Sequence, residues 1–204
     1  MRTLTSSLLV AFAGFSLAAT VAAQLTSKPV APETAVTAAV AAAEAARPEA
    51  SVRVGKVTRE QVEEAAPEWT MAEAKAAPDA AAARALGKVA PGASITIYLG
   101  TWCGDSRREV SRFFRALDEM GGEFPAAVEL IGVDEAKKEP ADLLAGADVR
   151  YVPTIIVRRD GKEVGRIVES SPHGIETDLL DLLEGRAAGV LSLRTDLAPE
   201  SPKP

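Results

Sequence analysis

An apolar run that leads through a short turn into an amphipathic helix is the feature that most restricts how this chain can fold. The run Ile95–Leu99 is typical of a buried strand, and residues 101–106 form the turn. The segment from Gly104 to Met120 is then expected to be a helix. Its apolar side chains recur at helical spacing, at Val110, Phe113, Phe114 and Leu117.

The turn contains Cys103, the only cysteine of the chain. A lone cysteine is more often an inert, buried residue that packs as a small hydrophobe. The N-terminal end of a helix, however, stabilises a thiolate, and partly exposed thiols in such places tend to be reactive. Because Cys103 follows a Gly-Thr-Trp turn and precedes polar residues, we interpret it as a reactive thiol.

Strands and helices alternate through residues 91–188, which we expect to form one domain. After Ile95–Leu99 and the helix that follows, the remaining expected elements are the strand Ala127–Val133, the helix Ala136–Ala145, the strands Thr154–Val157 and Lys162–Val168, and a helix from Ile175 to Gly185. Asp160-Gly161 is a hairpin turn signal. The order β-α-β-α-β-β-α predicts an α/β fold with a parallel sheet, right-handed crossovers and one antiparallel hairpin.

Residues 51–90 are expected to form an N-terminal helical extension that packs on this domain. The valines of residues 52–57 allow a short strand, and Thr58 with Gln61 has the spacing of a capping box at the start of a helix. We expect Glu68-Trp69 to interrupt that helix and Asp79–Lys88 to be a second one. Trp69 is interpreted as a core anchor, and ligand stacking is the alternative.

Residues 1–23 have the three parts of a signal peptide in order. Arg2 supplies the positive charge, Leu8 to Val21 is apolar, and Ala22-Ala23 suits cleavage before Gln24. A retained anchor is the alternative, although the segment is short for a membrane span. We therefore expect export to the periplasm or cell envelope, an oxidising compartment. An unpaired cysteine there is a free reactive thiol or forms an intermolecular bond.

Composition predicts disorder in the segments that flank the domain, and the charge pattern indicates which classes of binding partner to expect. Residues 24–50 are expected to be an Ala/Pro-rich disordered linker and residues 189–204 a disordered tail, because they have little apolar surface to bury. The formal net charge is −6 and the charges are mixed, so we expect neither nucleic acid nor an anionic membrane surface as a partner. No residues have metal-ligand spacing. We expect a monomer without a cofactor.

Two motifs within residues 93–185 resemble the thioredoxin-fold proteins. One is Trp102-Cys103-Gly104-Asp105-Ser106, and the other is Val152-Pro153-Thr154, which opens the third strand fifty positions after the cysteine. The resemblance implies a thioredoxin-like three-layer α/β/α fold with a mixed central sheet. It also implies a cis Pro153 that faces Cys103. Residues 107–110 resemble a branch of exported bacterial thioredoxin-like proteins.

Two positions depart from the family pattern. Ser106 stands where dithiol members have their second cysteine, so this chain cannot form an internal disulfide. Ile97 stands six residues before Cys103, where many thioredoxins have a buried carboxylate. Fast dithiol-type turnover is therefore not expected.

The resemblance also implies roles for the residues of the site. Cys103 is the nucleophile, and Ser106 together with the helix N-terminus stabilises its thiolate. Pro153 and Val152 position an extended substrate backbone beside the sulfur. The further candidates for substrate contact are Trp102, Gly104 and Asp105. Trp102 either lines a client groove or merely packs beside the turn.

Charged neighbours admit more than one interpretation. Asp105 suits the first turn of a helix but opposes a thiolate at Cys103. Arg107 and Arg108 either offset this effect, bind an anionic partner such as glutathione, or simply form a solvated face. His173, the only histidine, precedes the last helix and is interpreted as an ordinary polar residue rather than a catalytic base.

The expected function is thiol–disulfide exchange through a single cysteine. Cys103 would form mixed disulfides with protein thiols or glutathione, and an outside thiol would resolve them. The alternative is a client-binding module of the same fold without catalysis.

Overall fold

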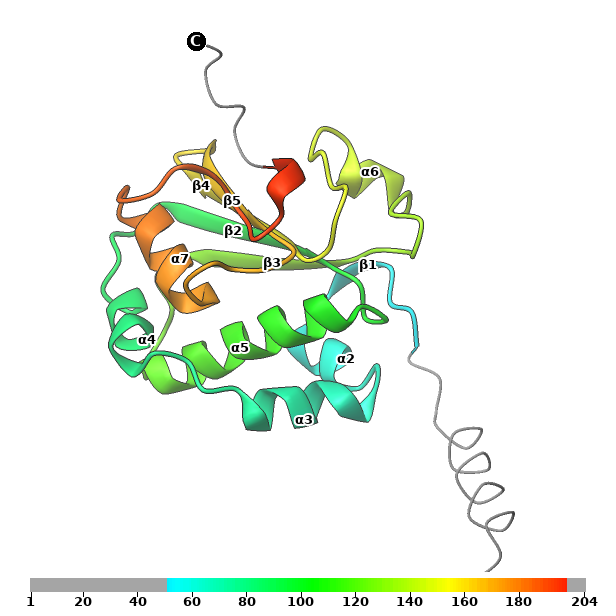
Figure 1. Ribbon diagram of the computed structural model, residues 1–204, viewed down its shortest axis with the longest axis horizontal. Coiled ribbons are helices and arrows are strands. Elements are labelled where there is room, and N and C mark those ends of the chain that lie inside the picture. Colours follow the sequence, from blue (N-terminus) through cyan, green and yellow to red (C-terminus); the bar gives the residue numbers. More distant parts are fainter. Residues whose placement is uncertain (1–50, 198–204) are drawn as a thin grey trace, which may run out of the picture. The chain divides into compact units, whose positions relative to one another are not determined.

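The structure is a computed structural model that describes residues 51–197 (Figure 1). The predictions of a signal peptide, of the linker up to residue 50 and of the tail from residue 198 lie outside the described residues. Within the described part of the chain, no helix is both long enough and apolar enough to cross a membrane.

A six-stranded mixed sheet forms the centre of the fold. Its strands are β1 (Gly55–Val57), β2 (Ala93–Leu99), β3 (Ala127–Gly132), β4 (Thr154–Arg159), β5 (Lys162–Val168) and β6 (Gly189–Leu191). Their order across the sheet is β1-β3-β2-β4-β5-β6. Strands β2 and β3 are parallel, as are β5 and β6, whereas the other neighbours are antiparallel.

The predicted antiparallel hairpin of β4 and β5 is confirmed, whereas the expectation that β4 runs parallel to β2 is wrong. The register explains the difference: Leu99 pairs with Gly132 at the end of β3, and Tyr98 pairs with Thr154 at the start of β4. The connection from β3 to β4 thus stays at one end of the sheet. Because β4 enters where β3 leaves, it runs antiparallel to β2.

Helices cover both faces of the sheet, which confirms the expected three-layer architecture. They are α2 (Arg59–Glu63), α3 (Pro67–Lys75), α4 (Ala80–Leu86), α5 (Gly104–Met120), α6 (Ala141–Leu144) and α7 (Ile175–Leu183). Figure 1 shows α3 and α5 on one side of the sheet and α6 on the other. From β2 onward the predicted order β-α-β-α-β-β-α is confirmed up to α7.

Residues 51–90 contribute to the core of the domain. Strand β1 pairs with β3, and the side chain of Trp69 is fully buried, as a core anchor should be. The capping box of Thr58 and Gln61 is present, and Asp79 caps α4. The helix is interrupted at residues 64–66 rather than at Glu68-Trp69, because Pro67 begins α3 and a proline suits the first turn of a helix.

Alternate residues of β2 face two separate hydrophobic cores. Ile95, Ile97 and Leu99 pack with side chains of α5 and α7 in the larger core. Tyr98 faces a smaller core that also contains Val152, beneath side chains of α6. Since successive strand residues point to opposite faces, the strand itself separates the two cores. Cys103 packs against the smaller one.

Two further predictions need correction. The tail expected to be disordered from residue 189 is ordered up to residue 197: β6 pairs with β5, and the Ser192 hydroxyl donates to the Val168 carbonyl oxygen at 2.7 Å. The helix expected over Ala136–Ala145 is confined to α6. Before it, the Asp134 carboxylate accepts the N–H groups of residues 138 and 139 at 2.7 and 2.8 Å, which holds a turn.

Candidate thiol site

Cys103 lies between the end of β2 and the start of α5, as the N-cap residue of that helix. Its N–H donates to the Gly100 carbonyl at 2.9 Å, and its own carbonyl accepts the N–H of Arg107 at 3.0 Å. The partly exposed thiol donates to the carbonyl oxygen of Val152 at 3.4 Å. The turn thus fixes the sulfur against the loop that precedes β4.

The loop that contains Val152 and Pro153 lies against the sulfur and is fixed by its own hydrogen bonds. Its peptide bond is cis, as predicted, and both residues are buried. The Pro153 carbonyl accepts the N–H of Glu169 at 2.7 Å, and the Thr154 hydroxyl donates to the Tyr151 carbonyl at 2.7 Å. The structure therefore brings together the two motifs that lie fifty positions apart in the sequence.

Ser106 is placed differently from its predicted role. Its side chain is fully buried, and its oxygen accepts the N–H of Gly100 at 3.1 Å. Among residues 51–197, no hydrogen bond joins Ser106 to Cys103. The hydrogen bond between Gly100 and Ser106 links the first turn of α5 to the end of β2. It can form because side chains in the first turn of a helix tilt toward the helix N-terminus, where β2 ends.

Trp102 packs against the turn itself. Its indole N–H donates to the Val133 carbonyl at 3.2 Å, and the Lys137 ammonium lies 5.7 Å from its ring centre. A Cβ on Gly100 would come within 2.7 Å of the ring, so only glycine leaves room for it there. These contacts favour a packing role over the lining of a client groove.

Gly104 and Asp105 form the exposed start of α5. A Cβ added to Gly104 would meet open space, so packing does not require glycine there. The Asp105 carboxylate pairs with Arg108 at 2.6 Å, which balances its charge. Arg108 also donates to Glu109, and burial raises the pKa of the Glu109 carboxyl while this ion pair opposes the rise.

His173 is placed beside Asp178 rather than in the site. Its Nδ1 lies 2.9 Å from the Asp178 carboxylate, and its side chain is 71% exposed. The backbone N–H of His173 donates to the same carboxylate at 3.1 Å. These contacts hold the segment that directly precedes α7 against that helix.

Thr101 organises the site, although the sequence analysis did not single it out. Its hydroxyl accepts the N–H of Arg53 at 3.1 Å and donates to the Ser51 carbonyl at 2.8 Å. Its carbonyl accepts the indole N–H of Trp69 at 3.0 Å. Thr101 thus ties two upstream segments to the cysteine turn. A hydroxyl residue at the start of the turn is the only local signal of this role.

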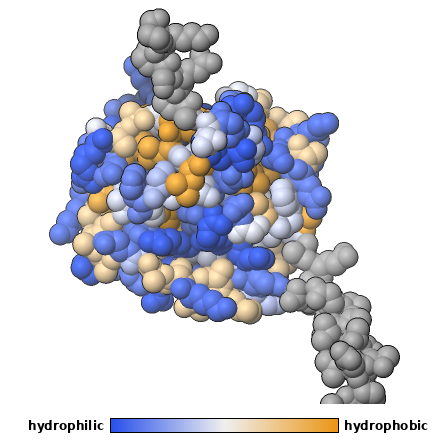
Figure 2. Space-filling model, viewed as in Figure 1, coloured by the Kyte–Doolittle hydropathy of each residue, from blue (hydrophilic) through white to orange (hydrophobic). Residues whose placement is uncertain are grey.

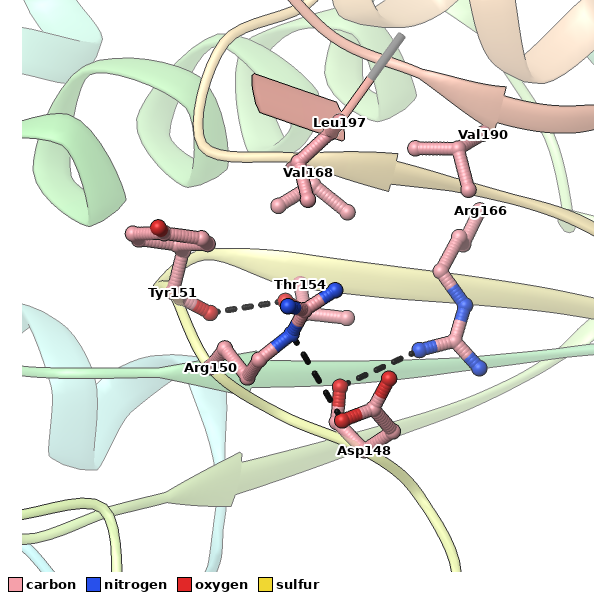
Figure 3. A pocket seen from close by; sticks show the side chains of 8 residues that line it. All are labelled: Asp148, Arg150, Tyr151, Thr154, Arg166, Val168, Val190 and Leu197. Atoms are coloured by element: carbon pink, nitrogen blue, oxygen red, sulfur yellow. Dashed lines mark hydrogen bonds and ion pairs between the residues drawn. The ribbon is translucent and has the colours of Figure 1, made fainter. Parts of the chain in front are cut away.

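Tyr151 was also missed. Its hydroxyl donates to Asp196 at 2.8 Å, which raises the pKa of the tyrosine, and the Arg194 guanidinium lies 3.7 Å from the ring centre. A cavity of about 90 Å³ adjoins it, shown in Figure 3. Its lining residues are Asp148, Arg150, Tyr151, Thr154, Arg166, Val168, Val190 and Leu197. Arg194 and Asp196 therefore hold the loop that contains Pro153 through their contacts with Tyr151.

Within residues 51–197, no group of three or more His, Cys, Asp or Glu residues is arranged to hold a metal ion.

Comparisons with known proteins point to one family. No protein-family model matches the chain. A thioredoxin-like protein of Acanthamoeba polyphaga mimivirus is 27% identical over 97 residues, covering 48% of this chain and 67% of that protein. A thioredoxin of Staphylococcus epidermidis is 26% identical over 94 residues, covering 46% and 85%. At low identity, these relatives support a thioredoxin-like family and suggest thiol–disulfide redox chemistry on protein thiols at that level.

A solved structure agrees with the fold alone. The crystal structure of an HIV epitope-scaffold protein matches with a TM-score of 0.51 at 15% identity, and the match covers 66% of this chain and 95% of that one.

Proposed function

Because the chain has a thioredoxin-like α/β fold with its single cysteine at the start of α5, we propose that it exchanges disulfides through Cys103 alone. The Cys103 thiolate attacks one sulfur of a substrate disulfide. A bond forms between the two sulfurs, the substrate S–S bond breaks, and the other half leaves as a thiolate. An outside thiol then attacks the mixed disulfide and releases Cys103.

The position of the thiol carries this proposal. The sulfur is partly exposed and lies 3.4 Å from the Val152 carbonyl, at the N-terminal end of α5, where negative charge is favoured. An extended client backbone would lie along Val152 and Pro153, beside the sulfur. Since Ser106 provides no second sulfur, the chemistry suits disulfide isomerisation, or removal of glutathione from protein thiols, better than net reduction.

We expect native Cys103 to react with the neutral disulfide dithiodipyridine faster than the same thiol in the urea-unfolded chain, by about tenfold at neutral pH. Stopped-flow absorbance of the released thiopyridone measures both rates. Cys103→Ser should release none. A native rate no higher than that of the unfolded chain would instead favour the client-binding module without catalysis.

Export is part of this proposal, on the basis of the signal-peptide pattern of residues 1–23. N-terminal sequencing of the protein recovered from the cell envelope should begin at Gln24 or within a residue or two of it. Recovery of envelope protein with Met1 intact would contradict cleavage.

A further inference from the structure

A hollow of about 450 Å³ on the surface of α5 is lined by cations and alanines. We call it the basic hollow and define it by Lys75, Arg107, Arg108 and Arg112, with alanines from α3 and the loop after it completing the lining. All of its charged lining residues are positive, although the formal net charge of the chain is −6. Figure 2 shows a mixture of hydrophilic and weakly hydrophobic residues over α3 and α5.

Two of the four cations already have partners. Arg108 donates to Asp105, Glu109 and Ser170, and Arg112 forms a forked pair with Glu176 at 2.7 and 2.9 Å. These pairs hold the two guanidinium groups in fixed positions. They also leave little of the charge of either residue for a ligand.

The other two cations have no such partners. Among residues 51–197, neither Lys75 nor Arg107 forms an ion pair or a side-chain hydrogen bond. Arg107 is partly buried beside the hollow. A guanidinium in such a place has lost part of its hydration and has donors to offer, and its fork suits a carboxylate. The hollow thus has two unneutralised positive charges, which select an anion.

The basic hollow includes a residue that lies one helical turn from the cysteine. The N–H of Arg107 donates to the Cys103 carbonyl at 3.0 Å, so the two residues are one helical turn apart, about 6 Å along the helix axis. On its other side, Arg108 reaches Ser170, which follows the residue whose N–H binds the Pro153 carbonyl. A ligand bound at Arg107 is therefore held about one helical turn from the backbone of Cys103.

We propose that the basic hollow binds the carboxylate of the small thiol compound whose disulfide reacts with Cys103, so that the preferred substrates are carboxylate-bearing disulfides. This inference rests on the proposed function. In this exchange the S–S bond of the substrate breaks as a bond between Cys103 and one of its sulfurs forms. The anionic half that is not retained leaves as a thiolate. The volume is in the range of pockets that hold small ligands.

Two disulfide probes test the charge preference. Dithiobis(nitrobenzoate) carries two carboxylates, whereas dithiodipyridine is neutral. In the double variant Lys75→Gln with Arg107→Gln, the rate with the anionic probe should fall about threefold to tenfold at low salt, while the rate with the neutral probe stays unchanged. High salt should lower the anionic rate of the native protein and have little effect on that of the variant.

A matched control separates the hollow from net charge. Lys88→Gln with Lys162→Gln also removes two positive charges, from exposed positions outside the hollow. This pair should leave the anionic rate nearly unchanged. An equal loss in both double variants would show a net-charge effect and overturn the proposal. An equal fall with both probes in the hollow variant would overturn it as well.

Binding without reaction distinguishes this inference from the proposed function. Unreactive nitrobenzoate should shift the NMR resonance of the Arg108 backbone N–H saturably in native protein, and it should cause no saturable shift of that resonance in the Lys75→Gln, Arg107→Gln variant. Saturable binding with no exchange at Cys103 would contradict the proposed function and still support an anion-binding site. Exchange without any binding would overturn the inference and leave the proposed function.

Discussion

Ser106→Cys is expected to give the protein a disulfide-reducing activity that the native chain lacks. Positions 103 and 106 are one helical turn apart, so the two sulfurs come within disulfide range. The variant should close an internal disulfide and, with dithiothreitol, reduce insulin. The gain is expected to be modest, since the fully buried Ile97 provides no carboxylate for proton transfer.

The structure adds a cost to this substitution. The Ser106 oxygen accepts the N–H of Gly100 in a buried place, and sulfur is a weaker acceptor. Loss of that bond should lower the free energy of unfolding by about 1–3 kcal/mol. Ser106→Ala is the matched control, because it loses the same bond without gaining a sulfur. It should be destabilised similarly and show no insulin reduction.

Mass spectrometry after mild oxidation checks closure of the new disulfide, and turbidity checks insulin reduction. A folded Ser106→Cys variant that never loses the mass of two hydrogen atoms on oxidation would contradict the turn geometry. A native protein that reduces insulin as well as the variant does would contradict the single-thiol mechanism.

Trp69→Ala is expected to lower the free energy of unfolding by about 3–5 kcal/mol, the range for a fully buried aromatic side chain. The ring is fully buried, its N–H donates to the Thr101 carbonyl, and its backbone carbonyl accepts the Ser111 hydroxyl at 3.3 Å. The substitution leaves a cavity between α3 and α5. Because Thr101 begins the cysteine turn, the reactivity of Cys103 should also fall.

Urea unfolding measures the loss. Met71→Ala is the matched control, since Met71 lies on the same helix and is 53% exposed, and it should change the free energy by less than about 0.5 kcal/mol. Trp69→Phe keeps most of the buried area and removes the indole donor, so its loss should be the smaller one. A Trp69→Ala loss as small as that of Met71→Ala would show that residues 51–90 are peripheral to the core.

The sequence by itself determined the central elements of the fold, because their signals are local. The apolar run of β2, the helical periodicity of α5 and the Asp160-Gly161 turn act over a few residues each. In the structure, Asp160 and Gly161 have φ of 50° and 76°, the left-handed backbone that such a hairpin turn requires. The resemblance of two motifs also predicted that Pro153 would face Cys103.

Only the tertiary structure decided which distant groups meet. The three-residue strand β6 has too little periodicity to predict, and pairing with β5 creates it. The valines of residues 52–57 allow a short strand, but nothing local shows that β1 pairs with β3. The partner of the Ser106 hydroxyl depends on where β2 ends. Arg112 finds Glu176 across 64 positions, whereas Lys75 and Arg107 find no counter-ion among residues 51–197. The order of charged residues along the sequence cannot show which cations are neutralised, because ion pairs depend on distances between side chains that only tertiary packing determines.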